Sequence, residues 1–173
     1  KIIDELGVCH GAARIDVAVI NGSLHGYELK SDLDSLTRLP DQASVYNSVL
    51  DRITLVVGKA HLHKAIKIIP DWWGVTVVKR NSDNNISFSQ IRKGSRNANQ
   101  NSVAIASLLW REEALDILEE LNQAEGYRSK TRQYIYERLA KLLDQQTLKT
   151  KVYNCLFTRT DWRSDSQCVI GGD

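Results

Sequence analysis

Three charged residues near the N-terminus have the types and spacing of a metal-assisted phosphodiester site. Asp16 interrupts the apolar run Ile15–Ile20, and Glu28 and Lys30 lie two residues apart on the segment that follows. Two carboxylates can hold Mg²⁺, which takes oxygen ligands and keeps several waters. The cation would lower the pKa of a bound water, while Lys30 could orient that water or stabilise charge on a scissile phosphate.

A β-hairpin must position these charges, because both segments have strand composition and an Asn21–Gly22 turn signal separates them. A two-residue turn would place Asp16 and Glu28 on opposite faces. A three-residue loop pairs Ile20 with Leu24 and places Asp16 opposite Glu28, and such loops are a common hairpin class. We therefore predict a connection of odd length or a bulge, with the three charges on one face.

The segment after the hairpin predicts a helix over Asp41–Asp51, with Pro40 suited to its first turn. Gln42 and Tyr46 are four residues apart and would lie side by side on this helix. Asp16, the Glu28-Leu29-Lys30 triplet and this Gln-x-x-x-Tyr helix, in that order, resemble the PD-(D/E)XK nuclease superfamily in its RecB-like branch. The resemblance covers about residues 1–79 and extends to uncharacterised bacterial and phage proteins of that superfamily.

The resemblance implies a Mg²⁺- or Mn²⁺-dependent deoxyribonuclease in which a metal-activated water hydrolyses DNA. The implied metal ligands are Asp16, Glu28, the Leu29 carbonyl and, as an addition, Glu5. Lys30 would position the nucleophile, and Gln42 and Tyr46 would orient the substrate and the waters. A Glu-x-Lys triplet on its own usually marks a solvated strand face, so the interpretation depends on the whole ordered set.

Basic residues near these segments are candidates for contacts with a nucleic acid. Arg14 would neighbour Lys30 across the hairpin in the three-residue register. Arg92 and Lys93 lie in a polar stretch that could approach a phosphate backbone or serve as a flexible linker. The resemblance adds Lys30, Gln42 and Tyr46 to the candidate nucleic-acid contacts.

Composition is ordinary for a globular chain: 173 residues, 42% hydrophobic, 25% charged, with a net charge of +2. The near-neutral charge does not by itself indicate nucleic acid, and no apolar run has the length of a membrane span. Three scattered cysteines without a paired motif favour a reducing cytoplasm. Because the chain contains no methionine, we expect residues to precede Lys1.

The order of apolar runs and amphipathic segments predicts an α/β fold, with a mixed central sheet flanked by helices and a C-terminal helical appendage. The resemblance makes this sheet restriction-endonuclease-like. We expect a core over 1–91, a basic polar linker over 92–101 and a helical region over 102–173. Within that order we predict a helix over Lys1–Leu6, a short edge strand over Ile86–Ile91, one long helix over Ser102–Asn122 and a mobile tail at Asp161–Asp173.

Two other classes of function stay open beside the nuclease. The chain could be a catalytically weak or inactive nucleic-acid-binding or regulatory module in a defence or repair assembly. It could also be an interaction subunit whose C-terminal helices mediate a homo-oligomer or a larger assembly. A helix pair joined by Gly126–Lys130 resembles SAP-like DNA-binding hairpins, with Arg128, Lys130 and Arg132 near the start of the second helix. The expected partner is a nucleic acid, with DNA favoured, and not a membrane.

Overall fold

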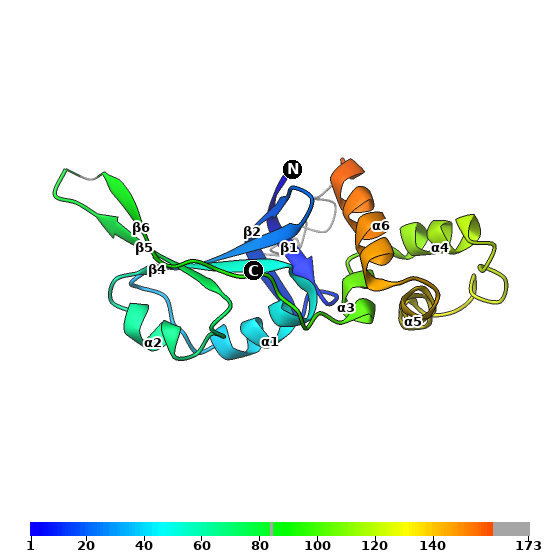
Figure 1. Cartoon of the computed structure of the whole chain (residues 1–173), viewed down its shortest axis with the longest axis horizontal. Helices are drawn as coiled ribbons and strands as arrows, with labels where there is room; N and C mark the ends of the chain where they lie inside the picture. Colours follow the sequence, from blue (N-terminus) through cyan, green and yellow to red (C-terminus); the bar gives the residue numbers. More distant parts are fainter. Residues whose placement is uncertain (84, 161–173) are drawn as a thin grey trace, which may run out of the picture.

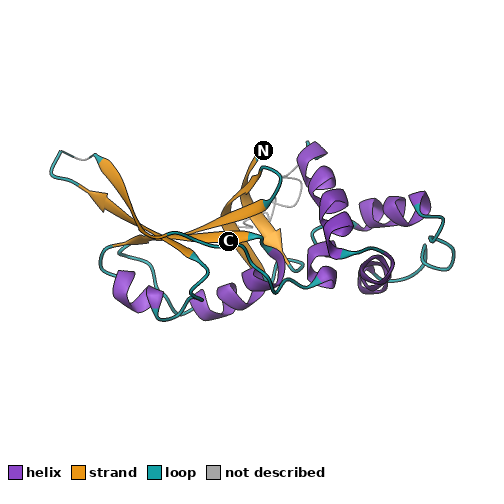
Figure 2. Cartoon of the chain, in the orientation of Figure 1, coloured by secondary structure: helices purple, strands orange, loops and turns teal. Residues whose placement is uncertain are grey.

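The computed structural model describes residues 1–83 and 85–160, which form a six-stranded sheet with a group of helices beside it (Figures 1 and 2). The strands in these ranges are β1 Ile2–Val8, β2 Ala13–Ile20, β3 Leu24–Lys30, β4 Arg52–Gly58, β5 Gly74–Arg80 and β6 Ile86–Arg92. The helices are α1 Leu39–Val49, α2 Leu62–Ile66, α3 Ser102–Ala106, α4 Arg111–Glu120, α5 Arg132–Leu142 and α6 Gln145–Thr158. The tail expected at Asp161–Asp173 lies outside the described residues.

The strands lie in the sheet in sequence order. β1, β2 and β3 are antiparallel, β3, β4 and β5 are parallel, and β6 is antiparallel to β5. Parallel neighbours need a crossover, and α1 and α2 supply the two crossovers from the same side of the sheet (Figure 1). The predicted mixed α/β sheet with flanking helices is confirmed, while the predicted domain boundaries stay a prediction.

The β2–β3 hairpin has the predicted three-residue connection. Ile20 pairs with Leu24, and Gly22 in the loop has a φ of +65°, which glycine adopts without strain. The pairing continues to Val17 opposite Tyr27. Alternation along β3 then places Leu24, Glu28 and Lys30 on its buried side.

The first segment is a strand and not the helix that we predicted over Lys1–Leu6. β1 pairs along its length with β2, and this pairing supplies the backbone partners that a helix would have made internally. Glu5 has a φ of +54°, and it lies between the paired positions Asp4–Val17 and Leu6–Ile15. The buried positions move from Ile3 to Leu6 across this point, so the strand turns its apolar side at Glu5.

The C-terminal helices α3 to α6 form a group at one end of the molecule (Figure 1). The long helix predicted over Ser102–Asn122 is instead two helices, because the backbone of Trp110 is extended at the N-cap of α4, where its N–H donates to Glu113 Oε2 at 2.7 Å. α3 packs against α1 as well as against α5 and α6, and it thereby connects the group to the sheet. No helix within the described ranges is long and apolar enough to cross a membrane.

At the opposite end β5 and β6 extend beyond the other strands as a two-stranded ribbon (Figure 1). Val77 is buried, whereas Lys79 and Arg80 after it are exposed. The predicted edge strand over Ile86–Ile91 is confirmed, and every one of its residues is exposed. The ribbon is therefore held by its own pairing and has little cover from the body.

Candidate functional site

The signature residues on β3 and α1 meet around the carboxylate of Glu28, which is only 1% exposed. Lys30 Nζ donates to Glu28 Oε1 at 2.6 Å, and Gln42 Nε2 donates to the same oxygen at 2.8 Å. The hydroxyl of Tyr46 lies 2.8 Å from Glu28 Oε2. The sequence order therefore identified side chains that do converge in space.

Helix α1 positions Gln42 and Tyr46 because its buried face repeats every three to four residues, through Leu39, Ala43, Tyr46 and Val49. Gln42 Nε2 lies 3.3 Å from the Tyr46 hydroxyl, as the i, i+4 spacing predicts. The Gln42 Oε1 atom is buried and has no hydrogen-bond partner among the described residues.

Asp16 and Glu5, the other carboxylates of the predicted metal set, serve different contacts. Asp16 Oδ2 accepts a hydrogen bond from the Leu29 backbone N–H at 2.7 Å. Glu5 is exposed and pairs with Arg14 at 3.2 Å. Within the described residues no group of three or more His, Cys, Asp or Glu side chains is arranged to hold a metal ion.

The donors around Glu28 do not fit a magnesium site. A hard cation needs oxygen ligands with free lone pairs, whereas Lys30 already supplies a positive charge to this carboxylate from 2.6 Å. Gln42 and Tyr46 contact its oxygens as well. The expectation of Mg²⁺ or Mn²⁺ stays a prediction, and the Glu28 cluster (Glu28, Lys30, Gln42 and Tyr46) has the contacts of an internal ion pair.

Burial sets the proton affinity of the Glu28 cluster. Desolvation raises the pKa of Glu28, and the hydrogen bond from Lys30 offsets only part of that rise. Desolvation, followed by the nearby charge of Glu28, raises the pKa of Tyr46 as well. The Tyr46 hydroxyl is also 2.6 Å from the Arg14 carbonyl, so its single proton serves either that carbonyl or Glu28 at one time. This network ties β3, α1 and β2 together.

The two arginines that were predicted to contact phosphate, Arg14 and Arg92, both bond to other parts of the protein. Arg14 is exposed and forms the ion pair with Glu5. Arg92 donates from Nε to the Trp73 carbonyl at 2.8 Å and from Nη2 to the Pro70 carbonyl at 2.9 Å. Its guanidinium therefore fixes the loop before β5, while its neighbour Lys93 is exposed.

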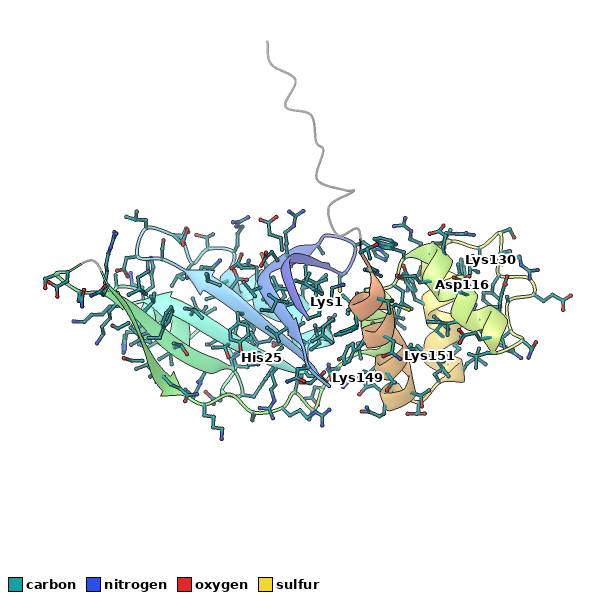
Figure 3. The ribbon with its side chains drawn as sticks, turned by 90° about the horizontal axis from the view of Figure 1, so that it is seen from above. Lys1, His25, Asp116, Lys130, Lys149 and Lys151 are labelled. Carbon is teal, nitrogen blue, oxygen red and sulfur yellow. The ribbon has the colours of Figure 1, made fainter. Side chains whose placement is uncertain are left out.

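A second buried charge cluster, around Asp51, was not predicted from the sequence. Asp51, which is 0% exposed, accepts from Lys149 Nζ at 2.8 Å and from the Tyr153 hydroxyl at 2.6 Å. The Leu24 backbone N–H also donates to it at 2.8 Å. Lys149 extends from α6 at the junction between the helices and the sheet (Figure 3). A lone aspartate before an apolar strand gives no local signal of a partner ninety-eight residues away.

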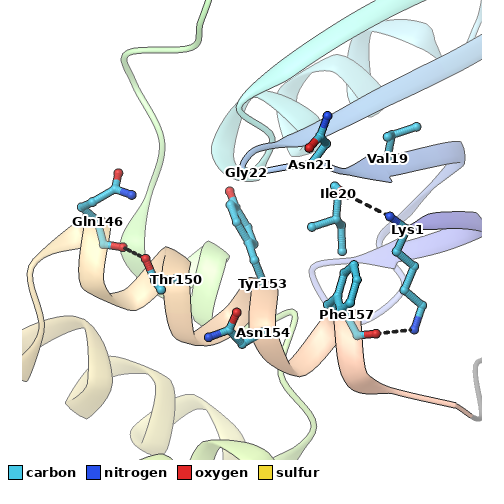
Figure 4. Close-up of a pocket in the computed structure, with 10 residues that line it drawn as sticks. All are labelled: Lys1, Val19, Ile20, Asn21, Gly22, Gln146, Thr150, Tyr153, Asn154 and Phe157. Atoms are coloured by element: carbon cyan, nitrogen blue, oxygen red, sulfur yellow. Dashed lines mark hydrogen bonds between the residues drawn. The ribbon is translucent and has the colours of Figure 1, made fainter.

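An open cleft of about 530 Å³ lies between the β2–β3 turn and α6 (Figure 4). The one charged side chain among the described residues that line it serves the fold, because Lys1 Nζ donates to the Phe157 carbonyl at 2.9 Å, and the Lys1 backbone nitrogen donates to the Ile20 carbonyl at 2.9 Å. Tyr153, on the same wall, binds the buried Asp51. The cleft therefore lies at a structural joint between sheet and helix.

Positive charge is concentrated at the end of the molecule that carries α2 and the ribbon. Residues 59–93, here called the basic end, contain seven Lys and Arg and two Asp, a net charge of +5 in a chain whose total is +2. The neighbouring carboxylate of Asp32 accepts from the Ala60 backbone N–H at 2.8 Å. Since the whole chain has a net charge of only +2, the residues outside the basic end are together net negative. The seven basic residues are Lys59, Lys64, Lys67, Lys79, Arg80, Arg92 and Lys93.

Comparison with protein families shows which family the chain belongs to. The family described as Bacteriophage P4 protein cII matches residues 1–171. The chain belongs to this family. Protein cII of Enterobacteria phage P4 is 32% identical over 117 residues, which are 68% of this chain and 44% of that relative. The chain thus aligns with less than half of the curated cII protein. No solved structure matches the chain.

Membership of the cII family overturns the resemblance to the PD-(D/E)XK nucleases. The prediction of a magnesium-dependent deoxyribonuclease depended on that resemblance and was also wrong. The same holds for the descriptions of the chain as a nuclease, a hydrolase and a metal-binding protein. The physical reason for the error is that a buried ion pair and a metal site use the same residue types. Glu-x-Lys on a strand beside Gln-x-x-x-Tyr on a helix packs here as a self-satisfied polar cluster.

Proposed function

We propose that this cII-family chain is a regulatory protein that binds nucleic acid without cleaving it. The observation that carries the proposal is the charge distribution. The basic end holds a net +5, while the remainder of the chain is net negative. A protein that neutralises phosphates with Lys and Arg gains affinity by releasing counterions, and a clustered charge is more effective than a dispersed one.

The exposure of these cations supports the proposal. Lys59, Lys64 and Lys67 on and around α2 are exposed, as are Lys79 and Arg80 on the ribbon. The buried lysines Lys30 and Lys149, in contrast, neutralise carboxylates of the fold. The buried lysines therefore belong to the fold, whereas these five cations of the basic end face solvent.

The Glu28 cluster supports the non-catalytic part of the proposal. Its carboxylate, its ammonium and its hydroxyl are hydrogen-bonded to one another or to backbone. A catalytic group must be able to reach a substrate, and a carboxylate that is 1% exposed cannot do so without opening the fold.

The test is fluorescence anisotropy of labelled duplex DNA over a range of salt concentrations, with the same samples run on a gel to detect cleavage. If about three phosphates are neutralised, the slope of log K against log salt is about −3. We expect that slope and intact DNA with or without Mg²⁺. Salt-independent binding, no binding, or metal-dependent cleavage would each contradict the proposal.

A further inference from the structure

The ribbon is the part of the basic end whose shape is the most specific. Beyond Val77, β5 and β6 form an antiparallel pair in which Val78 lies opposite Phe88 and Arg80 lies opposite Ile86. Asn81 closes the turn, since its side chain accepts from the Asn85 backbone N–H at 2.8 Å. The ribbon is visible as the extension beyond the sheet in Figure 1.

The two faces of the ribbon differ in chemistry. Directly opposed residues of an antiparallel pair share a face. One face therefore holds Arg80, Ile86, Phe88 and Gln90, which we call the groove face, and the other holds Lys79 opposite Ser87. Ile86 is 63% exposed and Phe88 is 66% exposed, so the groove face presents large apolar side chains to water.

We propose that the β5–β6 ribbon enters the major groove of duplex DNA with the groove face toward the base edges. This inference rests on the proposed function and names its contact element. The major groove is about 12 Å wide and admits a two-stranded β-ribbon. The side chains on the groove face are those that read bases there: arginine bonds to guanine, glutamine to adenine, and phenylalanine contacts the thymine methyl group.

Charge and shape favour DNA over other partners. Asp83 on the turn, beside Ser82 at 3.4 Å, is the one acidic residue between Lys79 and Lys93 in the sequence. The A-form duplex of RNA has a major groove too narrow and deep for such an element.

A second copy of the chain is the rival occupant, because the same sheet face continues onto the body of the protein, where Leu29 is 47% exposed.

The experiment uses the full chain and a labelled B-form duplex of roughly 20 base pairs, selected by the chain from a random pool. We expect Arg80→Gln and Phe88→Ser each to weaken binding by about tenfold, the size of one good base contact. The matched control is Lys141→Gln, which removes the same charge from an exposed residue of α5, outside the basic end. It is expected to change affinity by less than about threefold.

Two further measurements separate the outcomes. An RNA duplex of the same sequence is expected to compete weakly, and equal competition overturns insertion into the major groove. Leu29→Ser is expected to leave DNA affinity and sedimentation unchanged. If Phe88→Ser and Leu29→Ser both abolish a dimer while DNA affinity holds, the face belongs to a second copy and the inference is overturned.

The same binding data test the ribbon assignment separately from the proposed binding of nucleic acid. Salt-sensitive DNA binding that Arg80→Gln and Phe88→Ser leave unchanged overturns the ribbon assignment and leaves the proposed function standing. If selection recovers no duplex at all, both are overturned. Thermal melting of each variant checks that these exposed positions leave the fold intact.

Discussion

Lys149 of α6 donates to the carboxylate of Asp51 at 2.8 Å, across ninety-eight residues of sequence. Both side chains are buried, and Tyr153 and the Leu24 backbone N–H complete the shell of the carboxylate. This pair joins the C-terminal helices to the start of β3 and β4. It resembles the Glu28–Lys30 pair in being a buried lysine and carboxylate within one hydrogen-bonded cluster.

Removing Lys149 tests whether this joint stabilises the protein. Lys149→Met leaves Asp51 buried without its cation, which costs about 3–5 kcal/mol of unfolding free energy for pairs of this kind. The matched control is Lys151→Met, two residues along α6, whose ion pair with Glu120 is partly exposed. It is expected to cost at most about 1 kcal/mol. Urea unfolding measures both, and equal losses would show that Lys149 is not a special contact.

The two buried carboxylates predict opposite pH effects on stability. Burial alone would raise the pKa of Asp51, but hydrogen bonds from Lys149 and Tyr153 outweigh burial and lower it below the ordinary value of 3.8. A folded pKa below the unfolded one contributes stability above pH 3.8, and that stability is lost as the pH falls through the folded value. Asp51→Asn should therefore flatten the acid limb of a plot of unfolding free energy against pH.

Glu28 has the reverse sign. Its pKa is raised above the ordinary value of 4.5, chiefly by burial. The stability that this shift contributes is present below pH 4.5 and is lost as the pH rises through the folded value. Glu28→Gln should remove this decline while Asp51→Asn leaves it in place. A decline that persists unchanged in Glu28→Gln would place the titrating group elsewhere.

The internal pairing of Glu28 also predicts the response to metal. A ligand that binds the native state adds about 2.7 kcal/mol to the unfolding free energy at a hundredfold excess over Kd, and it thereby raises the melting temperature. Because Lys30 already occupies the cation position, we expect millimolar Mg²⁺ to leave the melting temperature within the error of the measurement. A melting temperature that rises with Mg²⁺, and no longer rises in Glu28→Gln, would establish a metal site there.

Two contacts between residues that are close in sequence were predicted correctly. The three-residue connection that pairs Ile20 with Leu24 was predicted because it places Asp16 opposite Glu28, and the contact of Gln42 with Tyr46 followed from helical spacing. The first strand was missed because its conformation depends on pairing with β2, which a short window of sequence does not contain. The partners of Asp51 were missed for the same reason.

The candidate site shows a different kind of limit. The four residues of the Glu28 cluster were identified correctly as neighbours, yet their residue types did not decide between a metal site and an ion pair. That decision depends on distances: Lys30 at 2.6 Å satisfies the carboxylate from inside the protein. The basic end was also hidden, because an overall charge of +2 averages a positive end with a negative remainder.

Two charge-matched triple variants test whether the basic end binds nucleic acid. The first replaces Lys59, Lys64 and Lys67 at the basic end with glutamine, and the second replaces Lys130, just before α5, and Arg132 and Lys141 of α5 in the same way. All six side chains are exposed, and each variant loses the same charge. Anisotropy of a labelled duplex at fixed salt then compares their affinities for DNA. The basic-end variant is predicted to bind at least about tenfold more weakly than the helical one, with a salt slope reduced by about 2 to 3. Equal affinities, or a larger loss in the helical variant, would contradict the claim that this end of the molecule binds nucleic acid.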